Sequence, residues 1–146
     1  MNIDEIQIGS PLYEAALELR YSLFFKEYDL PKKITADDME AASIHIAITE
    51  NDELLAYGHL SKLDINEYRV SQIVVNPDYQ GQGISKVLLE RLMNEAKTRG
   101  ARKIRLSAQE TVIGLYESIG FKQVGELYTV KLTGIPHIKM VYEVDT

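Results

Sequence analysis

The chain has 146 residues, of which 45% are hydrophobic, a formal net charge of -6 and no cysteine. This length suits one globular domain with a substantial core, and the missing cysteine excludes disulfides, thiolate metal sites and a cysteine nucleophile. The acidic balance argues against a nucleic-acid partner and favours a small cationic one. Residues 1–146 show no linker and no repeat, so we expect a single domain.

The beginning of the chain lacks the basic start and apolar run of a secretory signal. No apolar stretch elsewhere reaches the length of a membrane span. These two features predict a cytoplasmic protein without a membrane partner.

The first elements follow from local signals. Ile6 and Ile8 alternate with polar residues and predict a short strand. Ser10 and Pro11 are an N-cap and first-turn pair that begins a helix, and Pro31 ends this helix near residue 29. A polar loop over residues 32–42 follows. The helix is expected to bury one apolar face, made of Leu12, Ala15, Ala16, Leu19 and Leu23.

From residue 44 onward, the sequence predicts a hairpin of two strands, then four further strands and two helices. Isoleucines 44, 46 and 48 and the run 54–61 form the hairpin, and a strand over 68–75 ends in an apolar run typical of burial on both faces. A strong helix runs from residue 84 to Gly100, followed by a strand at 103–107, a helix at 111–119 and strands at 121–132 and 137–144. Strand, helix and strand over 68–107 form a right-handed crossover with a parallel pair. The predicted class is therefore α/β (α+β).

A glycine-rich turn, Gln80-Gly81-Gln82-Gly83-Ile84-Ser85-Lys86, joins the buried strand to the long helix. Unpaired N–H groups and the positive end of the helix dipole meet there and favour an anion. Gly81 and Gly83 remove side chains that would keep a phosphate from the backbone. Neither the Rossmann fingerprint nor the Walker A loop matches this spacing. A plain turn that uses glycine for its geometry is the alternative.

The turn resembles the acyl-CoA-binding signature of the GNAT N-acetyltransferases, Gln/Arg-x-x-Gly-x-Gly/Ala, with Ser85 where the family has Gly or Ala. Gln109, Tyr116 and Gly120-Phe121 resemble the second half of the family pattern, and residues 134–140 resemble its ElaA-like subgroup. The resemblance implies the GNAT acyl-CoA N-acyltransferase fold. That fold has a central mixed, mostly antiparallel sheet with a parallel splayed pair, flanked by helices.

The resemblance also implies acetyl-CoA as the cofactor. The strand end would pair with the pantetheine through the backbone of Ile73, Val74 and Val75. The pyrophosphate would lie on Gln80, Gly81, Gln82, Gly83, Ile84, Ser85 and Lys86. We expect Ser85 to change the detail of this binding and not to abolish it. Gln109 either bonds the pantetheine or makes an N-cap-like contact to the following helix.

Tyr116 matches the family's tyrosine that protonates the departing CoA sulfur, and a phenol is protonated at neutral pH. Its alternative role is core packing. The first candidate for the general base is His137, followed by Glu126, Asp38 or a water molecule. The alternative role of His137 is to order a loop. His45 and His59 are read as structural or substrate-lining. The histidine spacing gives no metal site.

The leading hypothesis is therefore an acetyl-CoA-dependent N-acetyltransferase. Without cysteine, the acetyl group would pass directly to a primary amine in a ternary complex. The acceptor is a small-molecule or peptide amine that the sequence does not name. A non-catalytic acyl-CoA-binding or regulatory module is the rival. Pairing of the last two strands across a two-fold axis would give a homodimer.

Overall fold

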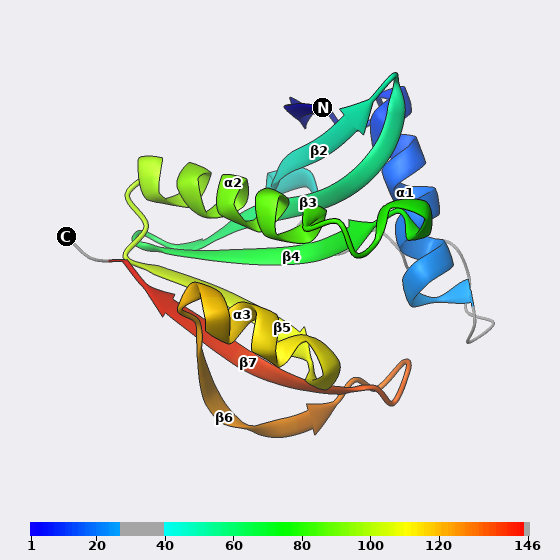
Figure 1. Cartoon of the computed structure of the whole chain (residues 1–146). Coiled ribbons are helices and arrows are strands. Elements are labelled where there is room, and N and C mark those ends of the chain that lie inside the picture. Colours follow the sequence, from blue (N-terminus) through cyan, green and yellow to red (C-terminus); the bar gives the residue numbers. More distant parts are fainter. Residues whose placement is uncertain (27–39, 145–146) are drawn as a thin grey trace.

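The computed structural model describes residues 1–26 and 40–144. Within these ranges, seven strands form one sheet in the order β1-β2-β3-β4-β5-β7-β6 (Figure 1). The strands are β1 (Asn2–Ile6), β2 (Ile44–Glu50), β3 (Glu53–Asp64), β4 (Glu67–Val75), β5 (Lys103–Gln109), β6 (Lys122–Thr129) and β7 (Pro136–Glu143). The helices are α1 (Pro11–Phe24), α2 (Ile84–Thr98) and α3 (Ile113–Ile119), and short 3-10 turns are η3 (Glu40–Ala42), η4 (Pro77–Tyr79) and η5 (Glu110–Val112).

The predicted parallel pair is confirmed. β4 and β5 are parallel, and the other ladders of the described residues are antiparallel. The β4–β5 register has three pairs, ending at Arg69 and Arg105. Beyond that point the two strands diverge, with β5, β7 and β6 bending away from the rest of the sheet (Figure 1). The parallel pair is therefore splayed at its carboxyl ends.

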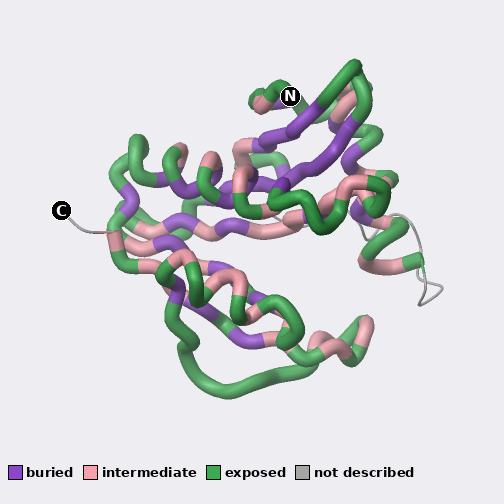
Figure 2. The backbone as a smooth tube through the Cα atoms, in the orientation of Figure 1, coloured by how far each residue is buried: buried purple, intermediate pink, exposed green. Residues whose placement is uncertain are grey.

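α2 covers the main core on one face of β2, β3 and β4. Its buried side chains are Ile84, Leu88, Leu89, Leu92, Met93 and Ala96. Gly58 on β3 allows close approach, because a Cβ there would meet Leu92 Cδ1 at 2.9 Å and Leu88 Cδ2 at 3.3 Å. Figure 2 shows long buried stretches on β2 and β3, under α2.

α1 packs on the opposite face. Ile46 belongs to the core under α2, whereas the next residue, Ala47, packs with Tyr13 and Ala16 of α1. Adjacent strand residues point to opposite faces, so the sheet separates two cores. Ser10 caps α1 as expected and accepts a hydrogen bond from the Tyr13 N–H at 3.2 Å.

The predicted buried face of α1 is partly wrong. The buried residues are Tyr13, Ala16 and Arg20, whereas Ala15 and Leu23 are exposed. Arg20 belongs to the buried face because its guanidinium pairs with Glu40, an interaction that apolar periodicity does not predict. The expected end of this helix near residue 29 lies outside the described residues.

Two smaller boundaries also differ from expectation. β1 ends at Ile6, and Ile8 lies beyond it with 51% of its surface exposed. The last predicted helix begins as the 3-10 turn η5 and becomes α-helical at Ile113. β6 pairs with β7 and exposes its side chains along its whole length, and a homodimer through these strands stays a prediction.

Candidate active site

β4 changes register where it faces β3. Tyr57 pairs with Val74, but His59 pairs with Ser71, so β4 carries one extra residue opposite Gly58. Gln72 lies in this bulge with φ 60, a left-handed conformation that is strained for a side chain other than glycine. Such strain is retained most often at functional sites. Sequence reasoning missed the bulge, because Gln72 carries no local signal for it.

The part of β4 beyond the bulge has one open edge. Val74 and Val75 pair with β3, while the described β4–β5 ladder has already ended at Arg69. An open strand edge presents N–H and C=O groups that an extended ligand can join as an added strand. The expected pantetheine position along Ile73, Val74 and Val75 therefore has no strand paired with it on the β5 side among the described residues.

The loop after β4 is fixed at its start. The Asn76 N–H donates to Leu55 O at 2.7 Å, and its side chain donates to Leu54 O and accepts from the Asp78 N–H. The Tyr79 hydroxyl donates to Glu53 Oε2 at 2.9 Å. These bonds hold η4 against the β2–β3 hairpin, so the glycine-rich turn starts from a rigid base.

Both glycines of the turn are left-handed, Gly81 with φ 81 and Gly83 with φ 76. Gly83 is the N-cap of α2, and the first intrahelical bond is from the Val87 N–H to Gly83 O. The N–H groups of Ile84, Ser85 and Lys86 therefore have no intrahelical partner. The first turn carries no acidic side chain, so its geometry and charge suit the anion site expected from the sequence, which stays a prediction.

Tyr116 and Gln109 come from the second half of the chain. Tyr116 on α3 packs edge-on against Phe121, and burial raises the pKa of its phenol, so the hydroxyl stays protonated at neutral pH. Gln109 ends β5 and occupies the N-cap of η5 without a side-chain capping bond. The N-cap contact considered for Gln109 is thus absent from this turn.

The sequence profile of the acetyltransferase (GNAT) domain matches residues 15–144. The chain belongs to the GNAT acetyltransferase family. It is 32% identical over 139 residues to protein ElaA of Escherichia coli K12, covering 92% of this chain and 89% of that one. The crystal structure of E. coli ElaA superposes with a TM-score of 0.83 at 25% identity, covering 98% and 100%.

More distant GNAT proteins have named activities. The [ribosomal protein bS18]-alanine N-acetyltransferase of E. coli K12 is 30% identical over 95 residues, which cover 63% of this chain and 64% of that one. An aminoglycoside 6'-N-acetyltransferase solved with coenzyme A has a TM-score of 0.82 at 20% identity, covering 100% and 98%. The predicted family, fold and acyltransferase class are confirmed, and with them the acyl-CoA cofactor.

Two of the predicted bases lie on the last two strands of the sheet, His137 on β7 and Glu126 on β6. His137 on β7 pairs in register with Gln109, so the structure brings these two predicted residues together. The His137 Nδ1–H donates to Ile135 O at 3.0 Å, which orders the turn before β7 as the structural alternative proposed. Glu126 lies exposed on β6. Asp38 lies outside the described residues.

A buried polar cluster under α1 is the other feature that sequence reasoning missed. Its members, all of them buried, are Tyr13, Arg20, Glu40, His45, Tyr57 and His59. Glu40 accepts from Arg20 Nη1 at 2.5 Å and from the Tyr13 hydroxyl at 2.9 Å. The only sequence signal was the pair of histidines on neighbouring strands.

Three side chains of this cluster could hold a metal ion, but they already make other interactions. Ligand atoms of Glu40, His45 and His59 lie within 4.8 Å of one another. However, the Glu40 carboxylate already holds the Arg20 guanidinium, and both ring nitrogens of His45 make hydrogen bonds. The arrangement fits an ion pair and a hydrogen-bonded chain better than a cation site.

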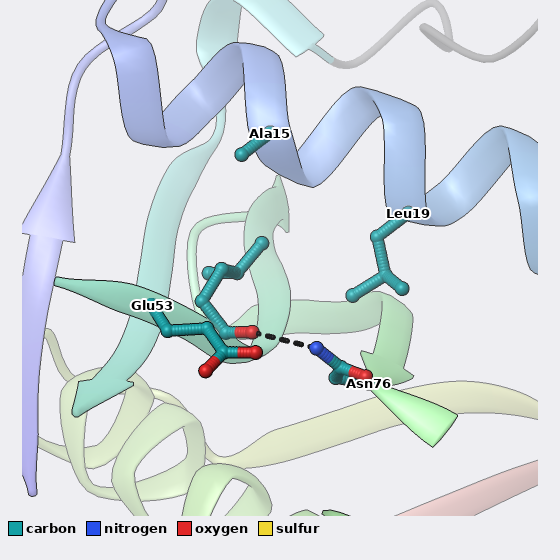
Figure 3. A pocket seen from close by; sticks show the side chains of 5 residues that line it. Ala15, Leu19, Glu53 and Asn76 are labelled. Carbon is teal, nitrogen blue, oxygen red and sulfur yellow. Dashed lines mark hydrogen bonds between the residues drawn. The ribbon is translucent and has the colours of Figure 1, made fainter. Parts of the chain in front are cut away.

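A shallow hollow adjoins the loop on the α1 side (Figure 3). Ala15 and Leu19 of α1 lie over Glu53, Leu54 and Asn76, and the Asn76 amide donates to Leu54 O across its floor at 3.2 Å. None of Tyr116, Gln109 or His137 lines it.

Among the described helices, none has the length and apolar character to span a membrane.

Proposed function

We propose that this protein transfers the acetyl group of acetyl-CoA directly to a primary amine. The observation that carries the proposal is the alignment of three features along one path. The glycine-rich turn at the α2 N-terminus is followed by the open edge of β4 and then by the bulge at Gln72. This order suits a ligand with an anionic end, an extended arm and a reactive thioester.

The cofactor would be bound mainly by backbone groups. N–H groups from Gln80 to Lys86 would hold the pyrophosphate, with the Ser85 hydroxyl and the Lys86 ammonium beside it. The pantetheine amides would pair with Ile73 to Val75, and Gln109 would bond the arm from the opposite strand. The thioester then reaches the bulge, where a backbone N–H released from the ladder polarises its carbonyl oxygen.

The chemistry requires a neutral amine and a protonated leaving group. The amine nitrogen attacks the carbonyl carbon, a C–N bond forms, and the C–S bond breaks with its electron pair on sulfur. Tyr116 supplies the proton to this sulfur, because burial keeps its phenol protonated. The chain has no cysteine to carry the acetyl group, which favours direct transfer. His137 stays the sequence-based proposal for the proton acceptor.

The acceptor class is a small-molecule or peptide amine. Relatives named for a protein N-terminal alanine and for an aminoglycoside give the range over which to search. Pocket side chains, and not the fold, decide among such acceptors.

The test is acetyl-CoA-dependent thiol release over a panel of peptide N-termini, aminoglycosides, polyamines and small amines. We expect at least one amine to stimulate release, and Tyr116→Phe to lower kcat by roughly 10²-fold with little change in the KM for acetyl-CoA. Thermal stabilisation by acetyl-CoA without release for any amine would contradict catalysis and support the binding module.

A further inference from the structure

The sheet has a polar face on the side of α1. On β4, β5 and β7, alternate side chains belong to the core under α2, among them Tyr68, Val70, Leu106 and Met140. Adjacent strand residues point to opposite faces, so the residues between these face the α1 side. They are exposed or half-buried, and they include Arg69, Ser71, Arg105, Ser107, Gln109 and His137.

Arg69 lies on β4 where the two halves of the sheet separate (Figure 1). Its register partners are Ser61 on β3 and Arg105 on β5, and the pair of arginines is the last of the β4–β5 ladder. Gln72 of the bulge follows three residues later on the same strand. Arg69 is therefore at the base of the splay, next to the open part of β4.

The two arginines place like charges on paired strands, but only one of them has a carboxylate. Arg105 donates to the Glu67 carboxylate from Nε at 3.0 Å and from Nη2 at 3.4 Å. Arg69 makes no hydrogen bond or ion pair with a residue of the described ranges. Like charges side by side repel each other, so the unpaired guanidinium favours an anion from outside the described residues.

The Arg69 guanidinium is accessible at its outer end. The residue is half-buried, and its Nε is buried without a hydrogen-bond partner among the described residues. The two terminal nitrogens also lack such a partner but are not buried, so they reach the surface. Ser71, the next residue on this face, has an Oγ that is likewise unpartnered among the described residues. Unsatisfied polar atoms on neighbouring side chains are expected where a ligand binds.

An unpaired guanidinium suits a carboxylate. Its N–H groups form a planar fork that binds both carboxylate oxygens through two parallel hydrogen bonds. A phosphate dianion would bring a second negative charge, and the neighbouring guanidinium of Arg105 is already paired with Glu67. A single carboxylate therefore matches the single unpaired charge.

We propose that Arg69 binds a carboxylate of the acceptor and thereby selects small amines that carry one, such as an amino acid or a dipeptide. This inference rests on the proposed function, in which the thioester lies at the bulge. Tyr116 packs against the core on the opposite face, which leaves the Arg69 face to the acceptor. Three residues of strand separate Arg69 from Gln72, or roughly 10 Å, which sets the span between carboxylate and amine nitrogen. Polyamines and aminoglycosides carry no carboxylate and should be poor acceptors.

The first test measures binding without turnover, because CoA without an acetyl group cannot react. Alanine, 4-aminobutyrate and alanylalanine, each beside its carboxamide, are titrated calorimetrically into the CoA-saturated protein. We expect at least one carboxylate to bind roughly 10- to 100-fold more tightly than its carboxamide. Arg69→Gln should lose this preference, and Arg69→Lys should keep part of it.

The matched control is Lys122→Gln, which removes the same charge from an exposed position on β6. Its preference for the carboxylate should equal that of the wild type. No preference in the wild type for any of the three carboxylates, or an unchanged preference in Arg69→Gln, would overturn the inference.

The second test compares acetyl transfer to the best carboxylate-bearing amine and to its carboxamide. In Arg69→Gln, kcat/KM for the carboxylate should fall roughly 10- to 100-fold through the KM of the amine, with the KM for acetyl-CoA and the rate with the carboxamide unchanged. An equal loss for both amines would mean a merely structural role and would overturn the inference. Wild-type transfer that ignores the carboxylate would overturn the inference alone. No transfer by the wild type to any amine would overturn the proposed function and this inference with it.

Discussion

At the scale of single residues, Gly83 meets two requirements at once. It ends the turn with φ 76, and its missing side chain leaves the first N–H groups of α2 accessible. Apart from its two chain neighbours, no described residue has an atom within 4 Å of the place where its Cβ would be. A side chain there would be strained and would occupy the expected phosphate position.

Replacement of Gly83 tests this reading. Gly83→Val should abolish the rise in Tm that CoA produces, while the fold persists. Gly9→Val is the matched control, because Gly9 has φ 87, also with nothing within 4 Å of its Cβ position. Both variants carry similar backbone strain, so thermal unfolding with and without CoA separates strain from binding. Equal CoA shifts in the two variants would mean that the loop does not bind the cofactor.

His45 gives a second prediction at this scale. Burial lowers its pKa in the folded state below the unfolded value near 6.5. The unfolded chain therefore binds more protons as pH falls below about 6.5, and the free energy of unfolding decreases there, whereas the contribution is complete above that pH. The wild-type Tm should drop between pH 7.5 and 5.5, and His45→Gln should drop less over the same range. Parallel pH curves for the two proteins would contradict the buried neutral histidine.

At the scale of elements, the contact between α2 and the hairpin depends on Gly58. This glycine stands opposite the extra residue of β4, and a Cβ would also meet Ile73 Cγ1 at 3.2 Å. A larger side chain would push α2 outward and disturb the strand that bears the predicted pantetheine edge. The bulge and the helix are therefore fitted to each other through one small residue.

Gly58→Val should consequently destabilise the fold by about 1–3 kcal/mol through overpacking. Chemical denaturation measures this change, and Gly114→Val on α3, where a Cβ meets nothing within 4 Å, is the control for a glycine without such contacts. A Gly58→Val protein as stable as the Gly114→Val control would mean that α2 has room to shift.

The elements also show what local sequence determines. The turn at Gly81 and Gly83 and the periodicity of α2 were predictable, because φ preference and helical spacing are properties of short segments. The bulge at Gln72 was not, because it arises from how β3 and β4 pair. The Arg20–Glu40 ion pair was also missed, since it joins residues 20 positions apart and places a charged side chain on the buried face of α1.

At the scale of the whole molecule, the sheet is two halves joined by a short parallel ladder. Glu67 on β4 accepts two hydrogen bonds from Arg105 on β5 at this junction, and the guanidinium lowers the pKa of the Glu67 carboxyl. Beyond it, one half carries the glycine-rich turn and the bulge, and the other carries Gln109, Tyr116 and His137. Function as proposed needs both halves, because donor and acceptor meet between them.

The most direct test of the proposed direct transfer is steady-state kinetics with acetyl-CoA and the best amine varied together. Direct transfer predicts double-reciprocal lines that intersect, because both substrates are bound before either product leaves. Parallel lines, or an acetylated protein isolated after incubation with acetyl-CoA alone, would contradict it.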